Sequence, residues 1–194
     1  MKEKTTKRDM LLEAGLSIFY EKGFEKATID EIVLLAECGK GTFYKYFNTK
    51  DEMVDALDDK FKKKMKESLN KNCPYKLSPE VFFTKVIKTL RKTFKENHKI
   101  GIIKFSIAHQ ANKLLERCNH NCGPIPEIEY VTNYVTEKIN EGEILKIEPR
   151  SLVACLMGSA HHMLFSDFKE NKPFTNNEIK DIVKVILSGV NPVC

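Results

Sequence analysis

The chain has 194 residues, 42% hydrophobic and 30% charged, which suits one globular domain or two small ones. Its formal net charge of +5 is mildly basic, which permits binding to nucleic acid without establishing it. No apolar run approaches the roughly 18 residues that a membrane span requires, and no apolar segment follows the charged N-terminus. We therefore expect a cytoplasmic protein without a membrane partner, whose six cysteines are mostly free thiols.

Apolar residues recur at helical spacing from the start of the chain. The first predicted helix ends at Gly23. Thr28 and Glu31 have the spacing of a capping box, in which each side chain accepts a hydrogen bond from the other residue's backbone N–H, and they open a short second helix. A tight turn at residues 37–39 and a third short helix at 40–47 follow.

Similar signals divide the rest of the chain into helices. Thr49 and Glu52 open a long helix that ends at Cys73, because the residue before a proline is pushed out of the helical conformation. We find no alternation of apolar and polar residues that requires a sheet. The sequence thus predicts an all-α fold of about nine helices, with a small N-terminal domain at 1–50 and a larger helical domain at 51–194. The later helices are predicted at 79 to about 97, 100–115, 127–140, from Pro149, and from a capping box at Thr175 and Glu178.

Residues 28–47 have the pattern of a helix-turn-helix, which lays its second helix in the major groove of DNA. In that second helix Phe43 and Phe47 are four residues apart, so they share the buried face. The lysines can neutralise phosphates, the Thr and Tyr hydroxyls can donate to phosphate oxygens, and the glycine lets the backbone come close. Lys50, in the first turn of the next helix, opposes the helix dipole unless an anion such as a DNA phosphate lies nearby. The residues left for DNA are Lys40, Gly41, Thr42, Tyr44, Lys45 and Tyr46.

Over roughly residues 8–57 the chain resembles the N-terminal domain of the tetracycline-repressor (TetR) family, and the rest resembles that family only in length and helix pattern. The resemblance implies a homodimeric repressor that binds a double-stranded DNA operator, binds a small-molecule effector among its middle helices and dimerises through its last two helices. It implies backbone-positioning contacts from Thr28, Thr42, Tyr44 and Lys50, and base-edge contacts near Lys40, Gly41, Lys45 and Tyr46. The runs that carry it are Leu12–Phe19, Gly23-Phe24, Ala27–Ile32, Lys40–Phe47 and Lys50–Met53.

Two residues of the predicted turn depart from the family pattern. Glu37 stands where the family usually has glycine, so it must take a conformation that glycine holds at lower cost, and it brings an anion near DNA. Gly39 stands where the family usually has serine, so a capping hydroxyl and a phosphate contact are missing. We expect weaker DNA binding than is typical of the family.

The two last predicted helices carry features of a dimer interface. Small residues in the first of them allow close contact between helices, and the final helix has an apolar stripe that would otherwise lie exposed. The alternative is that both helices simply pack inside one subunit. The small residues are Ala154, Gly158, Ser159 and Ala160.

The middle of the chain is rich in large apolar and aromatic residues, any of which can be core rather than the wall of a ligand pocket. His109 and His161 fall in apolar helical runs, where a buried histidine satisfies a hydrogen bond or ligates a metal or heme iron. The candidate pocket residues are Phe83, Phe94, Phe105, His109, Tyr134, Met157 and His161.

Cys118, His120 and Cys122 alternate with other residues in a predicted loop. Two thiolates and an imidazole could bind a soft metal such as zinc, or the thiols could form a redox-sensing disulfide, but three ligands are too few for a closed structural site. The other interpretation is a polar loop with two unpaired thiols. We expect no resident cofactor.

The chain has no nucleophile–base pair, phosphate-binding loop or zinc-protease motif, so we do not expect an enzyme. The sequence favours a ligand-responsive repressor released from a palindromic operator by a small molecule. The alternative is a metal-, heme- or redox-sensing regulator that uses the Cys118–Cys122 loop or a buried histidine.

Overall fold

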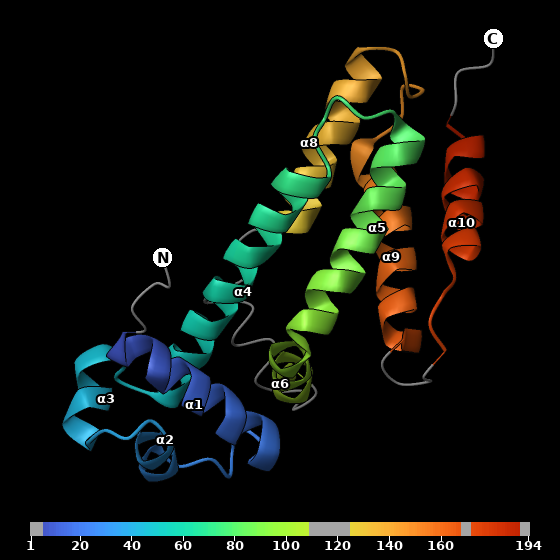
Figure 1. Ribbon diagram of the computed structural model, residues 1–194. Coiled ribbons are helices and arrows are strands. Elements are labelled where there is room, and N and C mark those ends of the chain that lie inside the picture. The colour runs from blue at the N-terminus through green and yellow to red at the C-terminus, as the bar shows by residue number, and fades with distance from the viewer. Residues whose placement is uncertain (1–5, 109–124, 168–171, 191–194) are drawn as a thin grey trace. The chain divides into compact units, whose positions relative to one another are not determined.

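The computed structural model describes residues 6–108, 125–167 and 172–190, without the side chains of 104–108 and 165 (Figure 1). All regular structure in these ranges is helical, which confirms the predicted all-α class. The α-helices are α1 (Lys7–Lys22), α2 (Ile29–Leu35), α3 (Lys40–Tyr46), α4 (Lys50–Asn72), α5 (Pro79–Glu96), α6 (His98–Ala108), α8 (Pro126–Asn140), α9 (Pro149–Phe165) and α10 (Asn176–Ser188).

Side chains cap several helices where the sequence predicts it. The capping boxes that begin at Thr28 and Thr175 are complete, and each satisfies backbone N–H groups that have no partner within the helix. The box predicted at the start of α4 is altered. Thr49 Oγ1 accepts from the backbone N–H of Glu52 at 3.1 Å, but the Glu52 carboxylate accepts from the backbone N–H of Asn48 at 2.7 Å.

The described helices form two compact units. The first contains α1, α2, α3, α4 up to Lys62, and α6, and the second contains the rest of α4, α5, α8, α9 and α10. The first unit therefore continues past residue 50, where the sequence predicts the end of the DNA-binding domain. It does so because α4 begins at Lys50 and its first part helps to bury the core of that unit, and because α6 packs on α1.

The core of the first unit lies among α1, α2, α3 and the start of α4. Phe43 and Phe47 are 0% and 2% exposed, as their spacing predicts, and their ring centroids are 5.8 Å apart. Ile32 from α2 and Phe19 from α1 are also buried. Burying a side chain of this size contributes about 1.5–3 kcal/mol, so these residues determine how the short helix α3 is oriented within its unit.

In the second unit α5 packs against α9 and α10, and α8 packs against α9 (Figure 1). Tyrosines fasten the segment between α4 and α5 to α8. Tyr134 stacks on Phe82 and donates its hydroxyl to the Leu77 carbonyl at 2.7 Å, and Tyr130 donates to the Cys73 carbonyl at 2.8 Å. Burial raises the pKa of the Tyr134 hydroxyl, so it stays a neutral donor.

A bidentate ion pair joins α5 to the segment between α9 and α10. Arg91 Nε and Nη2 lie 2.6 and 2.8 Å from the two carboxylate oxygens of Asp167, and Arg91 Nη1 donates to the Phe174 carbonyl at 3.0 Å. Asp167 also accepts from the Phe174 backbone N–H at 3.3 Å. The two charged side chains are only 15% and 18% exposed, so solvent screens this pair weakly.

The turn between α2 and α3 has the two features that its sequence predicts. Glu37 has φ +49°, which is the left-handed conformation, and no other non-glycine residue in the described part of the chain has a positive φ. Gly39 is the N-cap of α3 and supplies no side-chain hydrogen bond. Both departures therefore have a structural cost at the start of α3.

We expect Glu37→Gly to raise the free energy of unfolding by about 1 kcal/mol, because glycine removes the steric cost of the left-handed conformation. Thermal and urea unfolding measure it. The matched control is Glu37→Ala, which removes the same charge but keeps a Cβ in the left-handed region. Equal stabilisation by both variants would assign the effect to charge and would contradict the conformational explanation.

We expect Arg91→Ala to lower the free energy of unfolding by about 2 kcal/mol, because it leaves the half-buried Asp167 carboxylate without its bidentate partner. Urea titration measures the loss. The neighbouring Lys92→Ala is the control, since Lys92 Nζ lies 3.9 Å from Glu96 and both side chains are highly exposed. The expectation is wrong if the two variants unfold at the same urea concentration.

Candidate nucleic-acid interface

Helix α3 has one buried and one exposed side. Phe43 lies inside the unit, whereas Gly41, Tyr44 and Lys45 lie at helical spacing on the opposite side and are exposed. The Tyr44 side chain is 54% exposed although its ring makes an edge contact with Phe43. A cation, a phenol hydroxyl and a glycine that admits close backbone approach are thus presented together, which is a combination suited to DNA.

Lys40 begins α3 and is held by an acidic residue from α2. Its Nζ lies 2.8 Å from Asp30 Oδ1, and both side chains are exposed. The hydrogen bond and charge of Asp30 raise the pKa of Lys40, so the ammonium stays charged. Asp30 is not among the residues predicted from the sequence. The two residues are ten positions apart across a turn, and no periodic pattern connects them.

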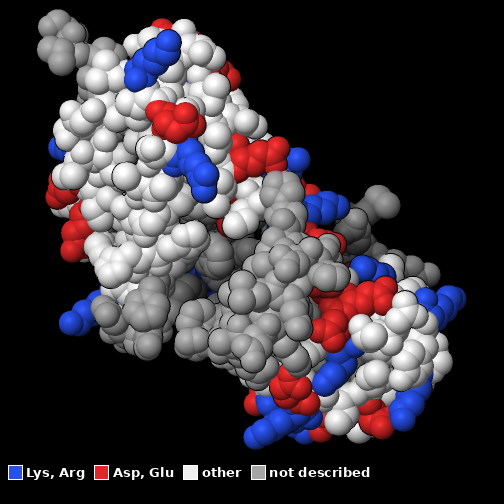
Figure 2. All heavy atoms as spheres, turned by 180° about the vertical axis from the view of Figure 1, so that it is seen from behind, with Lys and Arg blue, Asp and Glu red and all other residues white. Residues whose placement is uncertain are grey.

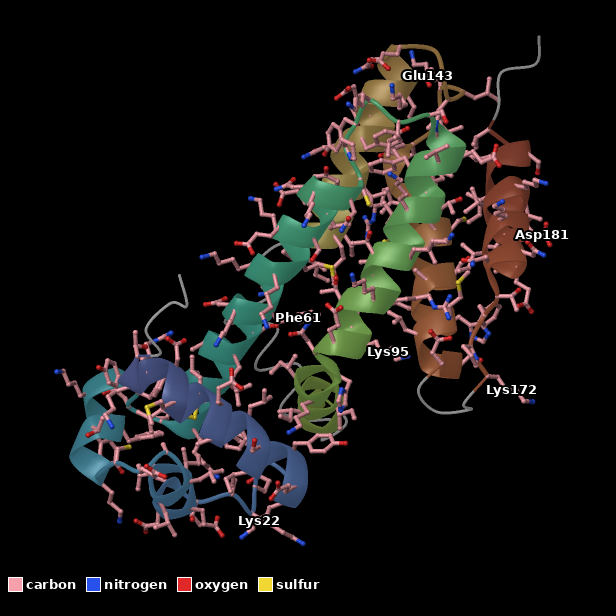
Figure 3. The ribbon with its side chains drawn as sticks, in the orientation of Figure 1. Lys22, Phe61, Lys95, Glu143, Lys172 and Asp181 are labelled. Atoms are coloured by element: carbon pink, nitrogen blue, oxygen red, sulfur yellow. The ribbon has the colours of Figure 1, made fainter. Side chains whose placement is uncertain are left out.

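The predicted phosphate contact from Thr28 involves a hydroxyl that is already engaged. Thr28 Oγ1 accepts from the Glu31 backbone N–H at 3.3 Å and donates to Glu31 Oε2 at 2.9 Å. Glu31 also pairs with Lys22, at the C-terminal end of α1 (Figure 3). The hydrogen bonds from Lys22 and then Thr28 lower the pKa of Glu31 to about 2. Thr28 would have to release Glu31 before it could donate to a phosphate.

Lys50 has a different environment from the one expected from sequence. Its Nζ donates to the carbonyl oxygens of Phe24 and Ala27 at 2.9 and 2.7 Å and lies 4.8 Å from the centroid of the Phe24 ring. These oxygens supply the negative partial charge that the sequence analysis assigned to a DNA phosphate. Lys50 therefore fastens the loop between α1 and α2 to the start of α4, and its phosphate contact stays a prediction.

Thr42 and Tyr46 lie at the margins of the exposed face and are half-buried. Lys45 Nζ lies 5.9 Å from the centroid of the Tyr46 ring, which directs this lysine along the face. Arg8 is a further residue not predicted from the sequence, and its guanidinium lies 5.3 Å from the centroid of the Phe47 ring. Arg8 lies on α1, far from the helix-turn-helix in sequence, so no local pattern pointed to this contact.

Charges of both signs are mixed on the face that Figure 2 presents. Figure 2 shows Lys and Arg side chains intermingled with Asp and Glu on the face of the molecule that it presents. The pairs Lys22–Glu31 and Lys40–Asp30 give the same mixture at single residues of the first unit. DNA binding here would thus depend on the placement of individual groups more than on a broad basic field.

The candidate pocket residues of the second unit lie in different environments. Phe83, Tyr134 and Met157 are buried, and the Phe83 and Tyr134 ring centroids are 6.1 Å apart. Phe94 is half-buried. His161 is exposed on α9, so the proposed buried histidine is not found at this position. The apolar run around His161 belongs to a helix with only one side in the core, and His161 lies on the other side.

The remaining candidates fall outside the described residues: His109, the Cys118–Cys122 loop and the Phe105 side chain. Within the described part of the chain, no group of three or more His, Cys, Asp or Glu residues is placed to bind a metal ion. None of the described helices has the length and apolar character needed to cross a membrane.

Known proteins match this chain at two scales: one family matches the N-terminal region, and individual regulators match most of the chain. Residues 11–57 match the family "Bacterial regulatory proteins, tetR family". The chain is similar to the uncharacterized HTH-type transcriptional regulator YhgD of Bacillus subtilis, with 24% identity over 89% of each protein. It is also similar to the HTH-type transcriptional regulator QacR of Staphylococcus aureus, with 23% identity over 96% of this chain and 83% of that protein.

A solved structure shares the fold. The crystal structure of the transcriptional regulator FadR from Bacillus subtilis in complex with stearoyl-CoA superposes with a TM-score of 0.73 and 19% identity, over 93% of this chain and 97% of that one. The family match covers the whole exposed face of α3, and the relatives that match over most of the chain are named HTH-type transcriptional regulators. The chain is thus a DNA-binding transcriptional regulator whose residues 11–57 match the tetR family.

Proposed function

We propose that this protein is a homodimeric repressor that acts on DNA in the cytoplasm, binds a palindromic operator through α3 of each subunit, and releases it when an apolar small molecule binds the second unit. The observation that carries the proposal is the exposed face of α3, on which Gly41, Tyr44 and Lys45 are presented while Phe43 is buried. A dimer would place two such helices in successive major grooves, about 34–36 Å apart.

The contacts with DNA fall into two kinds in this proposal. The Tyr44 and Thr42 hydroxyls donate hydrogen bonds to phosphates and position the helix. Thr28 can join them only after it releases Glu31, whereas Lys50 uses two of its three N–H donors on protein carbonyls and can offer the third. Lys40, Gly41, Lys45 and Tyr46 lie nearest to base edges. This division separates residues that set affinity from residues that set sequence preference.

The exposed side of α9 supports dimerisation through α9 and α10. Ala154, Cys155 and Gly158 lie exposed at helical spacing, and their small side chains would let a second helix come close. On α10, Val185 is 73% exposed, one turn after Asp181 on the outer side of that helix (Figure 3). Ala160, which the sequence analysis grouped with the interface, is 0% exposed and packs inside its own subunit.

The composition of the second unit supports an apolar effector. Its interior is lined by aromatic and aliphatic side chains, among them Phe83 and Met157. The FadR structure of Bacillus subtilis contains stearoyl-CoA, a molecule with a long apolar chain. An effector that binds one conformer of the second unit better than another would shift the spacing of the two α3 helices and so weaken operator binding.

Selection of genomic DNA fragments on the purified protein, followed by footprinting, would define the operator. We expect operator affinity to fall steeply with salt, and Lys45→Ala to relax the sequence preference at one base pair of each half-site, because a donor near a base edge is lost. The control is Lys88→Ala on the exposed side of α5. Binding that does not respond to salt would exclude the proposed DNA-binding mode.

We expect Val185→Glu to convert dimers into monomers, because it places a charge in the proposed interface while leaving the fold of one subunit intact. Light scattering after size exclusion measures the mass. Lys180→Glu, on another side of α10 and also exposed, should leave the dimer unchanged. A monomeric wild-type protein, or a dimeric Val185→Glu variant, would exclude an interface at this residue.

A further inference from the structure

The exposed ion pair between Asp30 and Lys40 calls for an explanation other than stability. Lys40 Nζ lies 2.8 Å from Asp30 Oδ1, and the side chains are 57% and 70% exposed. Pairs as exposed as this one add little to the stability of the fold. The pair does join the first turn of α2 to the first turn of α3, at the end of the exposed face that carries Gly41.

A carboxylate at this place would oppose DNA binding unless it has a role there. The phosphates of DNA repel it, and it cancels part of the charge of a lysine that could otherwise neutralise a phosphate. A carboxylate at a base edge, however, accepts a hydrogen bond from the amino group of cytosine, which is a recognised mode of sequence readout.

The hydrogen-bond donors of Lys40 and the acceptor of Asp30 are complementary to the groups that one G·C base pair presents in the major groove. Lys40 has three N–H donors, of which one meets Asp30, and the others can reach the O6 and N7 acceptors of guanine. Asp30 Oδ1 meets Lys40, which leaves Oδ2 to accept from cytosine N4. In the major groove guanine O6 and cytosine N4 lie side by side on one G·C pair, as the ammonium and the carboxylate do here.

We propose that Asp30 and Lys40 form one composite reader of a single G·C base pair in each half-site, with Asp30 also positioning Lys40 at the base edge. Without Asp30, the flexible Lys40 ammonium would reach the nearest phosphate, and that contact is the same for every sequence. This inference rests on the proposed DNA-binding function and adds Asp30 to the residues that set its sequence preference.

The test measures affinity for the selected operator and for each of its single base-pair variants at two salt concentrations. For the wild-type protein, we expect one G·C position in each half-site at which substitution by A·T weakens binding roughly 10-fold or more. Asp30→Asn should reduce that preference to about 3-fold or less and steepen the salt dependence, because Lys40 is freed for phosphates. Lys40→Met should lose the preference at the same position.

In the double variant of Asp30 and Lys40, the ratio of affinities for G·C and A·T at that position should fall no further than in either single variant, because the two side chains act as one reader. The matched control is Asp59→Asn, which removes an exposed carboxylate from α4 in the same unit and should leave the base-pair profile unchanged. A wild-type profile in Asp30→Asn, or a uniform change for all sequences, would overturn this inference alone. Failure of the wild-type protein to bind any fragment in a salt-dependent way would overturn the proposed function with it.

Discussion

The burial of Phe43 and Phe47 in the first unit is the constraint on which the interface depends. Helix α3 is too short to be stable alone, so its orientation comes from the residues that it buries. Once these two rings lie in the core, Gly41, Tyr44 and Lys45 must lie on the other side. The same packing brings the start of α3 beside the start of α2, where Asp30 meets Lys40. The packing of the core therefore determines which side chains of α3 are available to contact DNA.

Local signals explain why much of the fold could be predicted from sequence. The boxes at Thr28 and Thr175 join residues three apart, and the spacing of Phe43 and Phe47 lies within one helix. Such features are fixed by chain geometry and need no tertiary information. The positive φ of Glu37 was expected for a different reason, because the family that the chain resembles usually has glycine at that position.

Features that join distant residues could not be read in this way. Lys50 has a side chain and helix position that suit a phosphate, yet it binds two carbonyl oxygens more than twenty residues away. Arg91 and Asp167 are 76 positions apart, and no periodicity relates them. His161 lies in a run whose hydrophobicity does not distinguish the buried side of α9 from the exposed side. In each case the tertiary packing decides which of several chemically reasonable partners a side chain meets.

In the proposed interface, several of these contacts would limit the attraction to DNA. Glu37 and Asp30 add negative charge, Gly39 withholds a hydroxyl, and Lys50 is committed to the protein backbone. Each would reduce the electrostatic attraction to phosphates, which is the part of the binding free energy that is the same for every DNA sequence. The same features would weaken the hydrogen bonds to base edges less than they weaken the attraction to phosphates. A regulator built in this way would gain selectivity from low background binding, and a modest change of half-site spacing would then be enough to release it.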